Sequence, residues 1–284
     1  MSAVWVRKMI FKGECPADTI YPGNLYAYDV MNLKHLPNNL TIEGYLCIEN
    51  CNDLVGLPGG LSVLGDEIRI KNCESFTTVP EDLVFHKDVS FENCRRLREL
   101  PDEMVVPGDL NLNNTGIKRL PKGLSVFGSL HCDETDIEVV PDDVHIGWSL
   151  FLQECHELER LPENLHVHGD LNLWGCTNLK ELPSGLVVDG EFNVRDCVAL
   201  KTLPNDIKLW GPIYVKGSGL EHMMVYEDDD YLFEVVYHDG HYTLASNRFT
   251  YEEMIESWGE MGDRNAYIEA LKKHRAHLTA VASS

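Results

Sequence analysis

The feature that most constrains this chain is a proline that returns about every 21 residues. The prolines that share this register are Pro16, Pro37, Pro58, Pro80, Pro101, Pro121, Pro141, Pro162, Pro183 and Pro204. Ten of the thirteen prolines keep this period, so the repeat dominates the chain. A unit of this length cannot bury a core alone, and successive units must stack so that each covers the next. The period therefore predicts one elongated array over residues 16–224.

Each repeat contains a short alternating segment that follows a glycine-containing corner. In the stretch LPENLHVHGDLNLWGC, Leu171 and Leu173 point to one side, while Asn172 and Trp174 point to the other. This alternation is typical of a half-buried β-strand, and stacked repeats would pair such strands side by side. We therefore expect an α/β-class solenoid with a parallel β-sheet, a right-handed coil, few or no helices in the repeats, and a small α+β cap.

Cysteine or threonine occupies the position that closes most strands. The residues there are Cys51, Cys73, Cys94, Cys155, Cys176 and Cys197, with Thr115 and Thr135 in two repeats. Exchange with threonine indicates a packed, weakly hydrogen-bonding role and argues against a metal or disulfide role, as does the odd total of nine cysteines. Cys15 and Cys132 are expected in the core and Cys47 on the outward side of its strand. No cofactor and no metal site is predicted.

The run L-x-L-x-x-C-x-x-L followed by Leu-Pro occurs in LNLWGCTNLKELP and FNVRDCVALKTLP. It resembles the leucine-rich repeat, specifically the short Leu-Pro kind found in bacterial effectors and bacteriophage proteins. The resemblance covers roughly residues 16–224 and implies a curved scaffold that binds other proteins on its strand face. Some effectors carry a large catalytic domain, whereas only residues 225–284 follow the repeats here. A ubiquitin ligase is therefore not expected.

The repeat register assigns the outward strand side chains to three columns across the sheet. We predict that a partner binds Tyr45, Glu49, Glu67, Arg69, Asp88, Glu92, Asp109, His131, Asp133, Phe151, Trp174, Arg195, Tyr214 and Lys216. Exposed aromatic residues on a rigid sheet are typical interface anchors, and Phe151 and Trp174 fall on neighbouring strands. Arg195 and Lys216 add a basic end. The face is thus predicted to be acidic in its first half and aromatic and basic in its second.

Three acidic residues of the first column, Glu67, Asp88 and Asp109, fall on consecutive strands. Like charges at the strand spacing of about 4.8 Å destabilise a sheet unless water or a cation surrounds them. The alternative is that an aspartate after glycine is a corner residue that caps backbone amides. We consider this alternative for Asp109 and Asp170.

The balance of 46 acidic and 24 basic residues gives a formal net charge of −22. This charge opposes direct binding to nucleic acid and favours either solubility or a protein partner with a basic patch. An alternative interpretation is an acidic nucleic-acid mimic that blocks a DNA- or RNA-binding enzyme. No secretion signal or long apolar run is found, so we expect a cytoplasmic protein of a bacterial cell or a phage-infected host, without membrane contact.

Two histidines, His145 and His166, occupy equivalent positions in neighbouring repeats, and we expect them to stack. His168 alternates onto the same side as His166. Stacked histidines can chelate a metal. The pattern shows no carboxylate partner for them, so we interpret them as surface residues.

The two ends depart from the repeat. Residues 1–15 include the apolar segment AVWVRKMIFKG, which we predict to be a strand-like cap over the open edge of the first repeat. Residues 225–284 are predicted to form a separate module. It would begin with the acidic run YEDDDY, interpreted as a solvated loop, and continue with a β-hairpin around Asp239-Gly240. Thr250 with Glu253 indicates a helix start.

A second helix is predicted in RNAYIEALKKHRAHL, whose basic residues near its end suit the helix dipole. A small enzymatic activity of this module, using His238 or His241, is a second alternative. The chain contains no P-loop, H-E-x-x-H or G-x-S-x-G motif. The leading hypothesis is therefore a non-enzymatic scaffold that docks a protein partner on its concave strand face, as a phage or bacterial inhibitor of a host or defence protein would.

Overall fold

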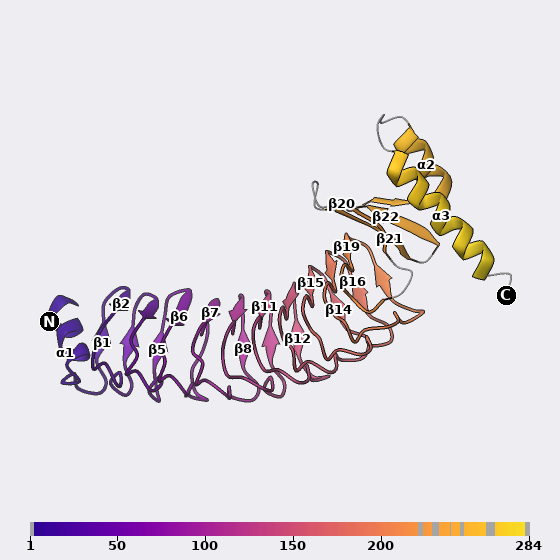
Figure 1. Ribbon diagram of the computed structural model, residues 1–284. Coiled ribbons are helices and arrows are strands. Elements are labelled where there is room, and N and C mark those ends of the chain that lie inside the picture. Colours follow the sequence, from indigo (N-terminus) through magenta and orange to yellow (C-terminus); the bar gives the residue numbers. More distant parts are fainter. Residues whose placement is uncertain are drawn as a thin grey trace.

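The computed structural model describes residues 3–220, 224–228, 233–238, 240–244, 247–259 and 265–281. The repeats wind into an elongated, bent array of coils, and a small module of strands and helices follows it (Figure 1). Each coil spans about 21 residues and contributes to parallel sheets, as in the pairings Leu130↔Leu150 and Leu150↔Leu171. The predicted parallel solenoid with a C-terminal α+β region is confirmed.

The main sheet has ten parallel strands in the order β19-β17-β15-β13-β11-β9-β7-β6-β4-β2. Their bounds are β2 (Leu25–Tyr28), β4 (Leu46–Glu49), β6 (Glu67–Lys71), β7 (Asp88–Ser90), β9 (Leu110–Asn111), β11 (Leu130–His131), β13 (Leu150–Phe151), β15 (Leu171–Asn172), β17 (Phe192–Asn193) and β19 (Ile213–Tyr214). The sheet lies along the upper edge of the array in Figure 1, on the inner side of its bend. We call its outward side the strand face. Its first strand, β2, precedes the strands that the predicted columns include.

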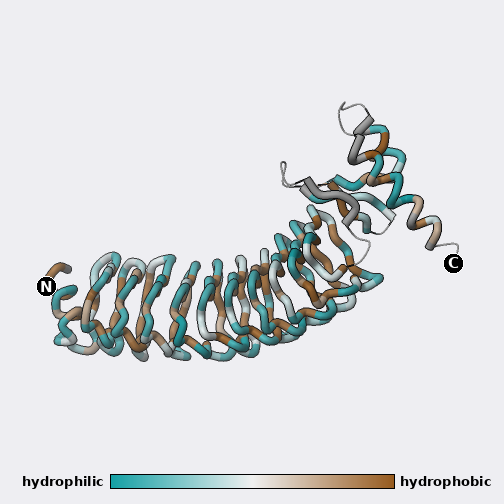
Figure 2. The backbone as a smooth tube through the Cα atoms, viewed as in Figure 1, coloured by the Kyte–Doolittle hydropathy of each residue, from teal (hydrophilic) through white to brown (hydrophobic). Residues whose placement is uncertain are grey.

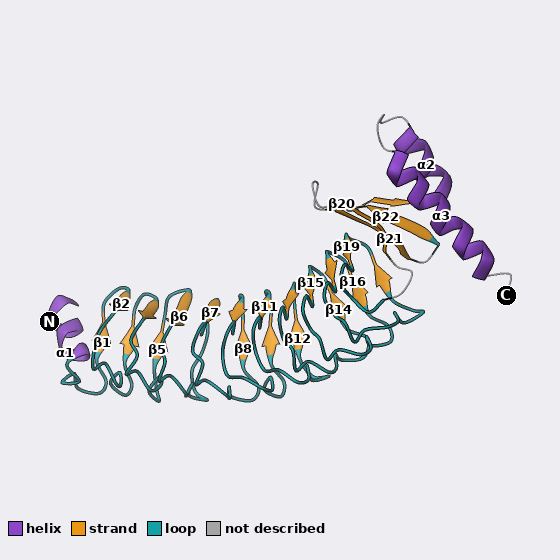
Figure 3. Cartoon of the chain, in the orientation of Figure 1, coloured by secondary structure: helices purple, strands orange, loops and turns teal. Residues whose placement is uncertain are grey.

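Nine of the ten coils also have a second pair of extended residues, which the sequence analysis did not predict; the coil that leads into β7 has no such strand. These form three further parallel sheets: β1 (Ile20–Tyr21), β3 (Thr41–Ile42) and β5 (Ser62–Val63); β8 (Val105–Val106), β10 (Ser125–Val126) and β12 (His145–Ile146); β14 (His166–Val167), β16 (Val187–Val188) and β18 (Lys208–Leu209). In each strand the second residue is buried. Figure 3 shows that loops make up most of the remaining chain in the coils.

The core is a continuous column of apolar side chains inside the coils. Leu171 and Leu173 are both 0% exposed, as the alternation predicts. Figure 2 shows hydrophobic positions recurring with hydrophilic ones along every coil. No helix in the described part of the chain has both the length and the apolar character to cross a membrane.

The cysteines and threonines that close the strands perform the same task. Cys176 Sγ donates to the carbonyl of Leu152 at 3.1 Å, and Thr135 Oγ1 donates to the carbonyl of Cys132 at 2.7 Å. Both kinds of side chain are buried and bond a carbonyl of the coil. The predicted packed, weakly hydrogen-bonding role is therefore confirmed, and all nine cysteines are free thiols.

Of the three remaining cysteines, two have the predicted burial and one does not. Cys132 is buried in the core and Cys15 packs half-buried against it, as expected. The prediction for Cys47 is wrong, because this side chain is only 3% exposed. It does leave the sheet on the strand face, but Tyr28 Oη lies 3.4 Å from its Sγ and Glu49 Oε1 lies at 3.4 Å. These two longer side chains cover the small thiol.

The N-terminal segment is a helix, α1 (Ala3–Phe11), and not the predicted strand. Val6 and Ile10 lie one helical turn apart and are buried against the first coil. Gly13, with φ of 68°, ends the helix by donating its backbone N–H to the carbonyl of Ile10. A helix satisfies its own backbone groups, so it covers the apolar edge of the array without adding a strand to it.

The C-terminal module pairs an antiparallel sheet with two helices. Its elements are β20 (Met224–Asp228), β21 (Phe233–His238), β22 (His241–Leu244), β23 (Asn247–Phe249), α2 (Tyr251–Gly259) and α3 (Asn265–Val281). The predicted hairpin is confirmed by the pairing of His238 with His241, although Asp239 itself lies outside the described residues. The interpretation of the acidic run as a loop is wrong for residues 226–228, because they are extended and belong to β20. The rest of the run lies outside the described residues.

The start of α2 has the predicted reciprocal cap. The backbone N–H of Thr250 donates to Glu253 Oε2 at 2.8 Å, and the backbone N–H of Glu253 donates to Thr250 Oγ1 at 3.2 Å. The backbone hydrogen bond from Thr250 is the main reason that the pKa of Glu253 lies below its ordinary value. The second predicted helix corresponds to α3.

Candidate functional site: the strand face

The first end of the strand face is a cluster of tyrosines. The rings of Tyr26 and Tyr28 stack with centroids 5.9 Å apart, and Tyr45 packs edge-on against Tyr26 at 5.4 Å. The hydroxyls of Tyr26 and Tyr45 are hydrogen-bonded. Tyr28 is 50% exposed, so the cluster offers aromatic surface. The sequence analysis included only Tyr45; the alternation in LYAY was the signal for the other two.

Opposite charges are interleaved on the next two strands. Arg69 pairs with Glu67 on its own strand and lies 3.9 Å from Glu49 on the preceding one. Lys71 pairs with Glu92 on the following coil. The first half of the face was predicted to be acidic, but here each acidic group has a basic neighbour. This region is a charge-paired network.

The aspartates of the first column bond the backbone of the next coil. Asp88 Oδ1 accepts from the N–H of Asp109 at 3.0 Å, and Asp109 Oδ1 accepts from the N–H of Ser129 at 2.7 Å. Asp170 Oδ1 likewise accepts from the N–H of Glu191 at 2.8 Å. The corner-capping interpretation is therefore correct for Asp109 and Asp170. These carboxylates hold neighbouring coils in register.

The middle of the face carries an aromatic pair and, two residues along the chain from its histidine, a half-buried acid. His131 and Phe151 are register partners, and their rings stack with centroids 4.6 Å apart and planes 11° apart. Asp133 Oδ1 accepts from the N–H of Gln153 at 2.8 Å, and Asn113 Nδ2 donates to its Oδ2 at 3.2 Å. Burial raises the pKa of Asp133 above its ordinary value.

Trp174 lies on the surface, as predicted, with 37% of its area exposed. Its indole Nε1 donates to Asp196 Oδ2 at 2.8 Å, so the ring has a fixed orientation. Other outward positions with small side chains are not accessible, because larger neighbours cover them. These buried positions are Ser90, Ser129, Ser149 and Asn193.

The predicted basic end is partly occupied by the chain itself. Arg195 Nε donates to Glu234 Oε1 at 2.5 Å, and its guanidinium lies 4.6 Å from the centre of the Tyr214 ring. The side chain of Glu234 is 1% exposed and its Oε2 accepts from the backbone N–H groups of Val215 and Lys216. Arg195 therefore joins the C-terminal module to the array. Its guanidinium already pairs with Glu234, so it is not an unpaired cation that a partner could bind.

The candidate residues do not converge on one point. Nine strand spacings of about 4.8 Å separate β2 from β19, so the face extends over roughly 40 Å. A small molecule cannot contact both ends of such a surface. The arrangement suits an extended partner.

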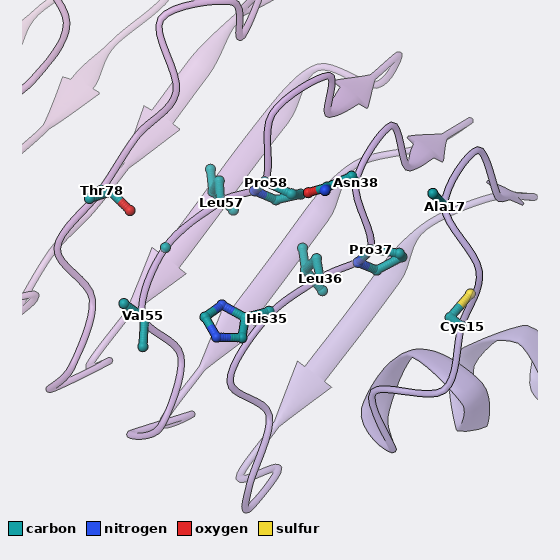
Figure 4. A pocket seen from close by; sticks show the side chains of 11 residues that line it. Cys15, Ala17, His35, Leu36, Pro37, Asn38, Val55, Leu57, Pro58 and Thr78 are labelled. Carbon is teal, nitrogen blue, oxygen red and sulfur yellow. The ribbon is translucent and has the colours of Figure 1, made fainter.

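Away from the strand face, the described part of the chain has open hollows at its Leu-Pro corners. One of about 500 Å³ lies at the Leu-Pro corners of the first coils, beside Leu36, Pro37, Leu57 and Pro58 (Figure 4). Its lining includes the ring of His35 from the same corners. Apolar side chains and backbone form most of its wall, which is the ordinary surface between neighbouring corners.

His238 and His241, the two histidines considered for an activity of the C-terminal module, lie in its sheet. His238 and His241 face each other across the hairpin, and His241 Nδ1 lies 3.5 Å from Arg248 Nη2. His238 also borders a hollow beside the Leu203-Pro204 corner.

The corner histidines differ from their predicted arrangement. His145 packs edge-on against Phe127, with centroids 5.7 Å apart, and not against His166. His145 and His166 belong to different sheets, which explains why they do not stack. His166 contacts His168 instead, with ring centroids 4.0 Å apart, and Asp189 supplies the carboxylate that the pattern did not reveal.

No known protein family, curated protein or solved structure matches this chain.

Proposed function

We propose that this protein is a non-enzymatic scaffold that binds a protein partner along its strand face. The observation that carries this proposal is the set of aromatic and charged side chains held at regular spacing on ten parallel strands. Neighbouring side chains restrain many of them, as in the His131–Phe151 stack and the Trp174–Asp196 hydrogen bond. Restrained side chains lose little entropy on binding, which favours affinity.

The anchors of the interface are Tyr28, Phe151 and Trp174. Tyrosine and tryptophan are enriched among the residues that contribute most binding energy, because they bury a large rigid surface and keep a polar group. These three side chains are distributed from the first coil to the eighth strand of the sheet. The partner would therefore make several separate contacts along one line.

The charge of the chain favours a partner with a basic patch. A net charge of −22 attracts a basic surface from a distance and accelerates the encounter. Together with the resemblance to short Leu-Pro leucine-rich repeats, this supports a bacterial or phage inhibitor of a host or defence protein that acts in the cytoplasm.

The test compares matched aromatic substitutions after the partner has been isolated by affinity capture from the native host and purified. Phe151→Ala and Trp174→Ala remove anchors from the strand face. Phe127→Ala and Trp210→Ala remove aromatic residues that are more exposed, at 59% and 58%, from the corners that precede the strands. We expect the first pair to raise Kd about 30-fold each, or about 2 kcal/mol, and the second pair to leave it unchanged.

Equal binding by all four variants would remove the strand face from consideration. Salt provides a second discriminating measurement. If affinity falls steeply with ionic strength and depends on Glu67 and Asp88 more than on the aromatic rings, the protein is an acidic nucleic-acid mimic instead.

A further inference from the structure

A cluster of two histidines and one aspartate lies at the corners that precede β15 and β17. His166 is the first residue of β14 and His168 follows that strand, so both side chains leave the backbone on the same side. Asp189 follows β16, which pairs with β14 through His166↔Val187 and Val167↔Val188. The same register places Asp189 opposite His168. This cluster is outside the strand face on which the proposed function depends.

The three side chains point at one another. His166 Nε2 lies 2.9 Å from Asp189 Oδ2, and His168 Nδ1 lies 3.2 Å from the same oxygen. One ligand atom from each of the three residues lies within 4.8 Å of the others. Tetrahedral ligands about 2.1 Å from one zinc ion are about 3.4 Å apart, so the two distances from Asp189 Oδ2 to the imidazole nitrogens would each have to increase by only a few tenths of an ångström around an ion.

The backbone holds these positions before any ligand binds. The N–H of Asp189 donates to the carbonyl of Val167 at 3.0 Å, between the two histidines. Val167 and Val188 are both 0% exposed and anchor the two strands in the core. The ligand side chains themselves remain open to water, with 44%, 52% and 39% exposed for His166, His168 and Asp189. An ion bound there would keep coordination positions for water or for a group from another molecule.

We propose that His166, His168 and Asp189 form a binding site for a divalent transition-metal ion that prefers imidazole, with Zn²⁺ as the reference ion. Two imidazole nitrogens and one carboxylate oxygen match the donor preference of zinc, copper and nickel, whereas calcium and magnesium prefer oxygen ligands alone. The site is independent of the proposed protein-binding function.

The test is a zinc titration of the full chain without a polyhistidine tag, in competition with a chromophoric chelator. His166→Ala, His168→Ala and Asp189→Asn each remove one ligand from an exposed side chain and are expected to keep the fold. His145→Ala is the matched control, because it removes a histidine from the equivalent position of the preceding coil. We expect one tightly bound zinc per chain, about tenfold or more weaker binding in each ligand variant, and no change in the control.

Ring signals in nuclear magnetic resonance spectra give a second readout. We expect one equivalent of zinc to shift the imidazole signals of His166 and His168 and to leave those of His145 and His131 unchanged. Equal zinc affinity of the parent chain and the His166→Ala/His168→Ala double variant would overturn the proposal. So would a response spread over all histidines, which would mean only weak binding to the acidic surface.

Discussion

At the scale of single residues, the array is held by side chains that bond the same position one coil away. Asn72 Nδ2 donates to Asn50 Oδ1 at 3.0 Å, Asn93 Nδ2 to Asn72 Oδ1 at 2.8 Å, and Asn114 Nδ2 to Asn93 Oδ1 at 2.7 Å. All four residues have φ between 52° and 60°, a conformation that asparagine tolerates better than most residues. This asparagine ladder both permits the turn after each strand and links the turns together.

Replacing Asn93 by alanine should destabilise the protein by about 3 kcal/mol. The change forces an alanine into a left-handed conformation and removes a hydrogen bond on each side, each effect contributing about 1 kcal/mol. Asn93→Gly keeps the backbone conformation accessible and should cost less. Urea unfolding measures both, with the exposed Asn52→Ala as a control near zero. Equal loss in the alanine and glycine variants would contradict the conformational part of this prediction.

The buried thiols give a prediction about chemical reactivity. Eight cysteines are buried and Cys15 alone is half-buried. Burial raises the pKa of Cys155 to about 11 and that of Cys197 to about 12, so little reactive thiolate forms at neutral pH. We expect iodoacetamide to label Cys15 alone in the folded protein and all nine cysteines in urea, as counted by mass spectrometry. A second site labelled as fast as Cys15 would show that the coils open locally.

At the scale of elements, both ends of the array are covered, and the last coil adds a buried polar contact to the apolar packing. At the first coil, α1 places apolar side chains over the core. At the last coil, β21 contributes Glu234, whose carboxylate reaches Arg195 and two backbone N–H groups after β19. The C-terminal module therefore joins the array through a buried polar contact as well as through Val236, which packs into the core of the array. The polar contact requires more specific geometry than apolar packing does.

Glu234→Ala should weaken this junction. The N–H groups of Val215 and Lys216 lose their shared acceptor and Arg195 loses its counter-ion, for an expected loss of about 3 kcal/mol in the free energy of unfolding. Hydrogen exchange of the two amides should accelerate, whereas the exposed Glu252→Ala should change neither quantity. Unaltered exchange at Val215 and Lys216 would show that the carboxylate does not hold the junction in solution.

At the scale of the whole molecule, the chain is long and strongly acidic. Each coil contacts mainly its neighbours, so stability accumulates along the array. Many carboxylates are distributed over a narrow rod, and the formal charge of −22 makes them repel one another.

Raising the ionic strength from low salt to the physiological range should therefore raise the melting temperature by a few degrees. Screening reduces the repulsion in the compact state more than in the expanded unfolded chain. Circular dichroism at several sodium chloride concentrations measures the effect. A melting temperature that falls with added salt would indicate that ion pairs such as Lys71–Glu92 outweigh the general repulsion.

The sequence by itself determined the solenoid, the inward leucines and the outward columns. Inside and outside alternate along a strand, so these properties depend on residues two apart and on the repeat period. Only the tertiary structure decided that Tyr28 covers Cys47, that Glu234 pairs with Arg195, and that Asp189 contacts two histidines. Each of these contacts joins residues 19 to 39 positions apart, at places where side-chain length and the lateral alignment of coils decide which groups meet. The sequence of a single repeat does not specify that alignment.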